Sequence, residues 1–128
     1  MAKILLVEDE AIIRDAFKII LSSSGHDLDV AINGAEALEL WNKSRYDLLL
    51  LDLMMPVLDG LGFLREVQIK DSAAGARVVV LSNLSSGEAT VEALQLGAHR
   101  HEVKANLAPS ELLKLVEQEL SQRRTSKK

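Results

Sequence analysis

Cysteine is absent from the 128 residues, and this absence excludes several chemistries at once. Disulfides, thiolate nucleophiles and cysteine-based zinc sites all require that side chain. Its absence also fits a reducing compartment, so we expect a cytoplasmic protein. The purely apolar runs are short, such as Leu48 to Leu51, whereas a membrane span needs roughly 20 residues. The N-terminal run Ile4 to Val7 is likewise too short for a signal peptide.

Positive charge is also scarce. Lys and Arg number 15 against 19 Asp and Glu, which gives a formal charge of −4. This balance argues against a direct nucleic-acid binder, which would present a basic face. Hydrophobic residues make up 48% of the chain, enough for a packed core. The length suits one domain, and the composition is unlike that of a disordered chain.

Two hydrophobic patterns alternate along the chain. Short apolar or alternating runs predict five strands, at residues 4–7, 28–32, 48–51, 78–81 and 99–103. Apolar residues at helical spacing predict the inner faces of five helices: Ile12, Ile13, Ala16, Phe17 and Ile20; Ala37, Leu38 and Trp41; Leu61, Leu64 and Val67; Ala89, Ala93 and Leu96; Leu112, Leu113, Val116 and Leu120. This alternation predicts a parallel sheet with helices on both faces.

Local signals set the ends of several elements. Asn33 can cap the second helix, with Glu36 three residues later as a variant capping box. Pro109 suits the first position of the last helix, and residues 73–75 predict a turn. Leucine favours helices, but Leu48–Leu51 is too short for one, so we interpret it as a strand covered on both faces.

Polar residues with compatible chemistry follow the predicted strands. The first strand is followed by Glu8, Asp9 and Glu10, the third by Asp52, the fourth by Ser82, and the fifth by Lys104. Ligands of such folds gather at the carboxyl ends of the strands. Two carboxylates about 4 Å apart repel by roughly 4 kcal/mol at an effective dielectric near 20, which raises a pKa or attracts a cation. Mg²⁺ prefers such oxygen ligands.

This set of residues supports phosphoryl transfer. The carboxylate of Asp52 can act as a nucleophile and form an acyl phosphate, provided that a cation screens its charge. The hydroxyl of Ser82 can donate to one phosphoryl oxygen, and the ammonium of Lys104 can neutralise another. Taken singly, the acids 8–10 could equally favour the positive end of a helix, so the interpretation depends on all of these residues together.

The motifs resemble those of the receiver domain of two-component response regulators, close to the single-domain chemotaxis type. They are LLVEDE at 5–10, DLMMPVLDG at 52–60, VLSN at 80–83, Gly97-Ala98 and Lys104, and the resemblance covers about residues 3–120. It implies a flavodoxin-like, doubly wound, five-stranded parallel sheet of order 2-1-3-4-5 with five helices. It further implies a receiver domain over 1–121 and a flexible basic C-terminal tail over 122–128.

The resemblance also implies roles for particular residues. Asp52 would accept phosphate from a sensor histidine kinase, a phosphotransfer protein or a small acyl phosphate, with Ser82 and Lys104 binding its oxygens. Mg²⁺ would be held by Glu8, Asp9, Asp52 and the backbone carbonyl of Met54. Ser82 and His101 would switch the surface of the last two helices and the fifth strand. A downstream target or output domain would read that surface, and the protein would be a monomer or a phosphorylation-dependent dimer, not a turnover enzyme.

Four positions depart from the family pattern. Ala105 replaces a proline whose bond to the preceding lysine is typically cis, and a non-proline cis bond costs roughly 2.5–4 kcal/mol, so the Lys104–Ala105 bond is either trans or strained. Asn83 replaces a small residue, and Ala108 a helix cap. His101 replaces a tyrosine or phenylalanine.

Two alternative functions follow from the sequence. The departures from the pattern would fit a phosphorylation-independent pseudo-receiver that acts as a protein-binding module. A flavodoxin-like cofactor protein is the other alternative, but three acids after the first strand would repel a flavin phosphate. A zinc site at His99 and His101 is disfavoured because no further ligands of the right type accompany them.

Overall fold

The computed structural model describes residues 2–67, 75–82 and 87–126. Part of the predicted turn at 73–75, Asn83 and the last two residues of the predicted tail lie outside this range. Within it, no helix has the length and apolar character that crossing a membrane requires.

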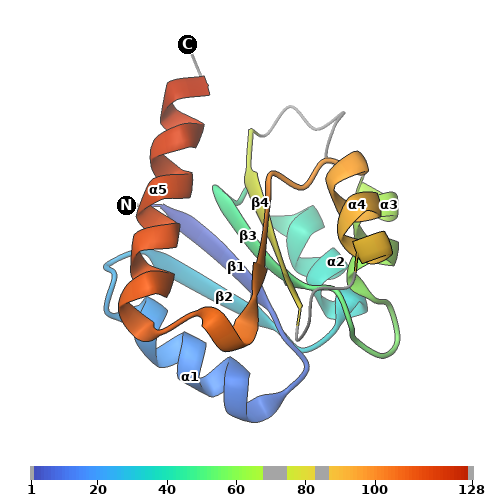
Figure 1. The fold of residues 1–128 in the computed structure, drawn as a ribbon, viewed down its shortest axis with the longest axis horizontal. Coiled ribbons are helices and arrows are strands. Elements are labelled where there is room, and N and C mark those ends of the chain that lie inside the picture. The colour runs from blue at the N-terminus through green and yellow to red at the C-terminus, as the bar shows by residue number, and fades with distance from the viewer. Residues whose placement is uncertain (1, 68–74, 83–86, 127–128) are drawn as a thin grey trace.

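Strands and helices alternate along the described chain as the sequence predicts. The strands are β1 (Lys3–Val7), β2 (Asp27–Ala31), β3 (Leu48–Asp52), β4 (Arg77–Ser82) and β5 (Arg100–Val103). The helices are α1 (Ala11–Ser22), α2 (Gly34–Lys43), α3 (Gly60–Val67), α4 (Gly87–Gln95) and α5 (Pro109–Ser126), with a 3₁₀ turn at Lys104–Asn106. The five strands are parallel in the order β2-β1-β3-β4-β5, which confirms the predicted topology (Figure 1).

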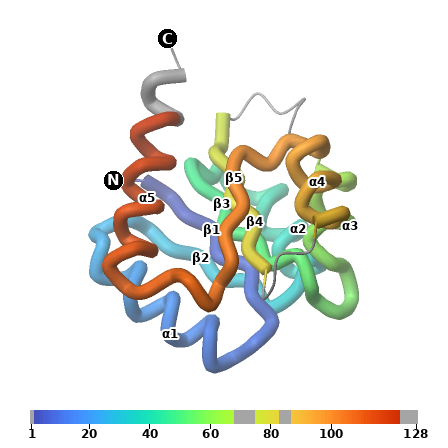
Figure 2. Tube along the Cα trace, in the orientation of Figure 1, coloured from blue at the N-terminus to red at the C-terminus, as the bar shows by residue number. Residues whose placement is uncertain are grey.

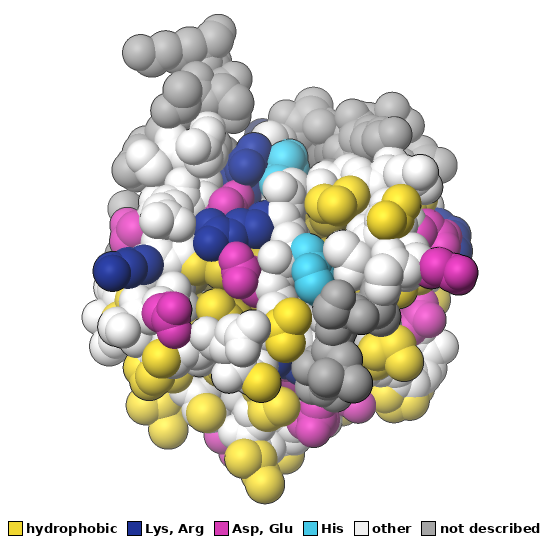
Figure 3. Space-filling view, in the orientation of Figure 1, with side chains coloured by type: hydrophobic (Ala, Val, Ile, Leu, Met, Phe, Trp, Pro, Cys, Tyr) yellow, Lys and Arg dark blue, Asp and Glu magenta, His cyan; other side chains and the backbone are white. Residues whose placement is uncertain are grey.

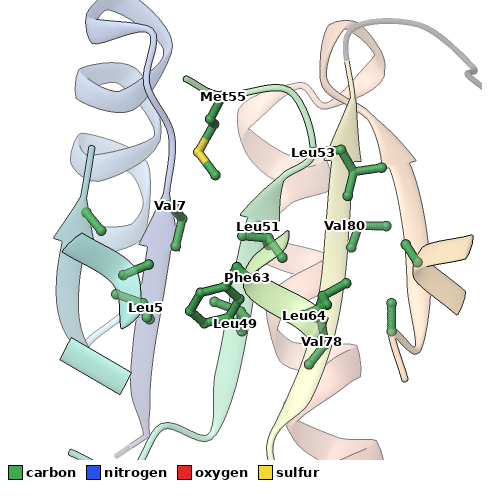
Figure 4. Packing of buried hydrophobic residues seen from close by; sticks show 14 of the residues in the cluster. Leu5, Val7, Leu49, Leu51, Leu53, Met55, Phe63, Leu64, Val78 and Val80 are labelled. Atoms are coloured by element: carbon green, nitrogen blue, oxygen red, sulfur yellow. The ribbon is translucent and has the colours of Figure 1, made fainter. Parts of the chain in front are cut away.

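The central strands are apolar throughout because helices cover both faces of the sheet. Leu5 and Val7 of β1 pack into the cluster covered by α2, α3 and α4 (Figure 4). Ile4 and Leu6 of the same strand pack into the cluster that contains the apolar residues of α1 and α5. Successive side chains of a strand point to opposite faces, so a strand buried on both sides shows no polar alternation. The strand interpretation of Leu48–Leu51 is confirmed for the same reason.

The buried faces of some helices differ from the faces that the sequence predicts. Ile12 is 87% exposed and Ala16 is also exposed, whereas Phe17 and Leu21 are buried. The predicted residues Ile13, Phe17 and Ile20 do pack in the core, together with Leu21, so the buried face of α1 is narrower at its start than predicted and excludes Ile12 and Ala16. In the other helices, the predicted stripes missed Phe63 and Leu115, which are both buried.

The predicted signals at the starts of the helices act largely as expected. The Asn33 side chain accepts a hydrogen bond from the Glu36 backbone N–H at 2.8 Å, and the Glu36 carboxylate accepts one from Ile32 N–H at 2.9 Å. At α5, the Glu111 carboxylate accepts a hydrogen bond from Ala108 N–H at 3.3 Å, so one of the free amides has a partner. Helix α5 continues to Ser126, into the segment predicted as a flexible tail, and the division of the chain after residue 121 stays a prediction.

Close backbone packing between two loops holds the end of β3 in place. Gly34 N–H, at the start of α2, donates to the carbonyl of Leu58 in the β3–α3 loop at 3.0 Å. A Cβ at Gly34 would collide with that carbonyl, whereas a Cβ at Gly87 would meet open space. The β3–α3 loop is therefore packed against α2 without room for a side chain.

We expect Gly34→Ala to lower the free energy of unfolding by about 1–3 kcal/mol, the typical cost of overpacking. Gly87→Ala is the matched control and should be neutral or slightly stabilising, because alanine favours helices over glycine. Urea denaturation of both variants measures this difference. Equal stability of the two variants would show that the loop contact imposes no constraint.

Candidate functional site

The carboxyl ends of the parallel strands gather at one edge of the sheet, in the lower part of Figure 2. Acids 8–10 follow β1, and Asp52 ends β3, the strand beside it. Ser82 ends β4, and Lys104 directly follows β5. The sheet register, in which Ser82 lies opposite Val103, therefore brings residues far apart in sequence to the same edge.

Lys104 is the centre of this edge. Its Nζ atom lies 2.9 and 3.2 Å from the carboxylate oxygens of Glu8, 3.3 Å from Asp52 Oδ2 and 3.4 Å from Glu10 Oε1. Glu8 is fully buried, Asp52 is 1% exposed and Lys104 is 6% exposed. Charges this far from water interact strongly and are costly when unbalanced. One ammonium therefore faces three carboxylates and cannot neutralise all of them.

This imbalance changes the proton affinity of the buried groups. Burial, followed by the nearby charge of Glu8, raises the pKa of Asp52 to about 7, while Lys104 opposes the shift. Burial alone would lower the pKa of Lys104, but hydrogen bonding to Glu8 and the charge of Asp52 outweigh it, and the pKa of Lys104 is raised. Lys104 therefore stays a cation, whereas the carboxyl of Asp52 holds its proton more tightly than an exposed aspartate does.

The same edge offers oxygen atoms to a metal ion. Carboxylate oxygens of Glu8, Asp9 and Glu10 lie within 4.8 Å of one another. Asp9 Oδ1 is buried without a hydrogen-bond partner, and Asp52 Oδ2 has only the ion pair with Lys104 at 3.3 Å. Buried acceptors usually have a partner, and hard oxygen donors with excess negative charge suit a divalent cation such as Mg²⁺. The residues present therefore fit such an ion.

Met54, whose backbone carbonyl stays a predicted ligand, contacts Asp52 through its backbone amide. Its backbone N–H donates to Asp52 Oδ1 at 3.2 Å, and its side chain is exposed. This hydrogen bond fixes one oxygen of Asp52 and leaves the other oxygen to Lys104.

The two predicted switch residues are in direct contact. Ser82 Oγ lies 2.9 Å from His101 Nε2, across the pair formed by β4 and β5. Ser82 is buried at the end of its strand, and His101 is half-buried. A phenylalanine could not make this contact because its ring has no hydrogen-bonding atom, whereas an imidazole nitrogen can donate to the hydroxyl or accept from it.

The alanine after Lys104 does not misdirect the lysine. The Lys104–Ala105 bond is trans, and residues 104–106 form the 3₁₀ turn. Of the two alternatives that the sequence left open for this bond, the structure has the trans form. The ammonium reaches its carboxylate partners without a cis peptide.

Two contacts at the site were missed by sequence reasoning. Glu10 reaches Lys104, although the sequence analysis gave it no role beyond the acidic cluster. Arg14 Nη1 donates to the backbone carbonyls of Glu8 at 3.1 Å and Asp9 at 3.3 Å. The sequence did carry a signal for the Arg14 contacts: a basic residue in the first turns of the helix that follows the acids. Helical side chains lean toward the N-terminus of their helix, so such a residue can reach back to the preceding loop.

Comparison with known proteins agrees with this geometry. The model of the response regulator receiver domain matches residues 4–117. The chain belongs to this family. Receiver domains of two-component systems are signalling regulators, and members of the family are generally magnesium-dependent.

Similar proteins include both single-domain and larger regulators. The chain is 33% identical over 111 residues to chemotaxis protein CheY of Halobacterium salinarum, covering 86% of this chain and 91% of that protein. It is 37% identical over 110 residues to the probable transcriptional regulator ycf27 of Porphyridium aerugineum, covering 86% of this chain. The chain spans 44% of the length of that regulator, and about half or less of several other curated relatives.

Solved structures show the same fold. A CheY-like receiver domain protein from Methanospirillum hungatei superposes with a TM-score of 0.89 at 25% identity, covering 98% of both chains. The receiver domain of sensor histidine kinase PA1611 from Pseudomonas aeruginosa has a TM-score of 0.82 at 25% identity, covering 94% of this chain and 98% of that one. The latter structure contains a magnesium ion coordinated in its active-site cleft.

The raised pKa of Asp52 predicts that, in metal-free buffer, the difference in stability between the wild type and Asp52→Asn depends on pH. Between about pH 4 and pH 7 the native carboxyl binds more protons than the unfolded one, so the wild type loses stability as pH rises. Asp52→Asn lacks this loss and should be more stable at pH 8 by on the order of a few kcal/mol, with a smaller difference at pH 4. Urea denaturation at both pH values measures it.

Asp15→Asn is the control, because Asp15 is an exposed acid on α1. It removes the same charge without relieving a buried carboxyl and should show little pH-dependent difference. A difference between wild type and Asp52→Asn that does not vary with pH would contradict the assigned pKa.

Proposed function

We propose that the protein is a phospho-accepting response regulator receiver, in which Asp52 takes a phosphoryl group from a histidine kinase or phosphotransfer protein. The observation that carries this proposal is the buried contact of Lys104 with Asp52 and Glu8. A carboxylate that must attack phosphorus needs a fixed cation beside it, because its own charge repels the donor. Lys104 supplies that charge.

The acids at the end of β1 complete the site. Glu8, Asp9, Asp52 and the Met54 carbonyl would hold Mg²⁺, which when bound screens the carboxylates and binds a phosphoryl oxygen. Ionised Asp52 attacks the phosphorus of the phosphohistidine, and the bond between phosphorus and nitrogen breaks. The imidazole nitrogen of the donor keeps the electron pair. Ser82 donates to one phosphoryl oxygen and Lys104 neutralises another.

Contact between Ser82 and His101 links this chemistry to the surface. Where Ser82 is the donor in its contact with His101, turning its proton to a phosphoryl oxygen breaks that hydrogen bond. His101 is a residue of β5, which runs between α4 and α5 in Figure 2. The face of the molecule seen in Figure 3 carries side chains of both charges. A partner that distinguishes the two arrangements is bound more or less tightly after phosphorylation. That partner would be a downstream target or an output domain, and the setting would be cytoplasmic.

The pseudo-receiver alternative has less support than phosphorylation. It depended partly on Ala105 misdirecting Lys104, but the ammonium lies against Glu8 and Asp52. Each side chain that the phospho-acceptor site requires is present at the sheet edge, and Ser82 and Lys104 are buried there.

Incubation with acetyl phosphate and Mg²⁺ tests the proposal directly. Intact-mass spectrometry should show the addition of one phosphoryl group to the wild type, none to Asp52→Asn, and little when EDTA replaces Mg²⁺. Asp15→Asn should be phosphorylated like the wild type. A protein that takes no phosphoryl group from acetyl phosphate, phosphoramidate or a kinase would instead be a pseudo-receiver.

We also expect the His101 ring to respond to the site through Ser82. Mg²⁺ with beryllofluoride, a phosphoryl mimic, should shift the ¹H and ¹⁵N ring signals of His101 in NMR spectra of the wild type. Ser82→Ala should abolish most of this shift. His99 is an internal control, because its Nδ1 accepts from Val78 N–H at the other end of β5. Amide shifts near Asp52 without a change at His101 would contradict the coupling.

A further inference from the structure

Arg14 folds back from α1 over the loop that carries the acidic residues. Its Nη1 atom donates to the carbonyl of Glu8 at 3.1 Å and to that of Asp9 at 3.3 Å. The guanidinium therefore binds the backbone of two successive residues whose side chains face the sheet edge. Because the group is planar and permanently charged, these are charge-assisted hydrogen bonds.

Other contacts also hold this loop, among them those of the Lys104 ammonium with the side chains of Glu8 and Glu10. Glu8 N–H donates to the Ala31 carbonyl at 3.0 Å, and Glu10 N–H donates to the Glu8 carboxylate at 3.1 Å. Glu10 is the N-cap residue of α1, yet its side chain makes no capping hydrogen bond. These contacts restrain the amide groups of the loop, and Arg14 restrains its carbonyls.

We propose that Arg14 is a positioning residue for the cation site, fixing the backbone of Glu8 and Asp9 so that their carboxylates stay close enough to share one ion. The inference rests on the proposed function, because it assumes that the ion is Mg²⁺. The carboxylate oxygens lie within 4.8 Å of one another, and mutual repulsion would separate them if the loop were free. Groups behind metal ligands commonly set affinity in this way.

The direction in which Mg²⁺ affinity changes when Arg14 is removed distinguishes a positioning role from a purely electrostatic one. A guanidinium next to the acids repels a divalent cation, so its removal should tighten Mg²⁺ binding if charge alone matters. If Arg14 orders the loop, its removal should weaken Mg²⁺ binding despite the gain in negative charge. Lys18, one turn further along α1 and exposed, provides a charge change without a loop contact.

Calorimetric titration with Mg²⁺ at constant ionic strength tests this inference. Arg14→Gln should bind Mg²⁺ about tenfold more weakly than the wild type, the usual effect of losing an outer-shell partner. Lys18→Gln should bind as tightly as the wild type or slightly more tightly. Arg14→Lys keeps the charge but loses the planar fork, so it should also bind more weakly, and it carries the test if Arg14→Gln does not fold.

Amide hydrogen exchange provides a second measurement that needs no metal. In metal-free Arg14→Gln, the Glu10 amide should exchange faster than in the wild type and in Lys18→Gln. The inference would be overturned if both Arg14→Gln and Arg14→Lys bound Mg²⁺ as tightly as the wild type. It would also be overturned if the Glu10 amide of Arg14→Gln exchanged at the wild-type rate. A wild type that binds no Mg²⁺ would instead contradict the proposed function, whatever the exchange rates show.

Discussion

The contact of Lys104 with the buried carboxylates is the constraint on which the rest of the site depends. Folding brings Lys104 within reach of Glu8, 96 residues away, and removes both side chains from water. Breaking a buried pair by removing one partner leaves an uncompensated charge, which is strongly destabilising. Here the charges do not balance even with both partners present, because Asp52 and Glu10 share the same ammonium with Glu8. The structure is therefore poised to accept further positive charge.

The sheet makes this arrangement possible. Strands covered on both faces are apolar in their interiors, so their polar residues lie at the strand ends, including the carboxyl edge. Parallel pairing places these ends together, and the 3₁₀ turn after β5 returns Lys104 to them. Close packing of Gly34 against Leu58 secures the loop behind Asp52. The same elements that form the core therefore fix the geometry of the acids.

Much of this could be predicted from the sequence, and what was missed has physical causes. The strand over Leu48–Leu51 and the acids at strand ends follow from local patterns that carry their own signal. The orientation of Ile12 does not, because neighbouring apolar residues fit two helix faces almost equally well. The contact of His101 with Ser82 depends on how two strands meet, which periodicity does not encode. The contacts of Arg14 are local, but a pattern of apolar residues carries no information about a basic side chain.

The central claim is that the unbalanced carboxylates at the sheet edge form a site for a divalent cation. Thermal unfolding at increasing Mg²⁺ and constant ionic strength tests it most directly, because an ion that binds the native state alone stabilises it by about 2.7 kcal/mol at 100 times its Kd. The account predicts that the melting temperature of the wild type rises with Mg²⁺ and that Asp9→Asn loses most of the rise. An equal rise in both proteins, or none in the wild type, would contradict it.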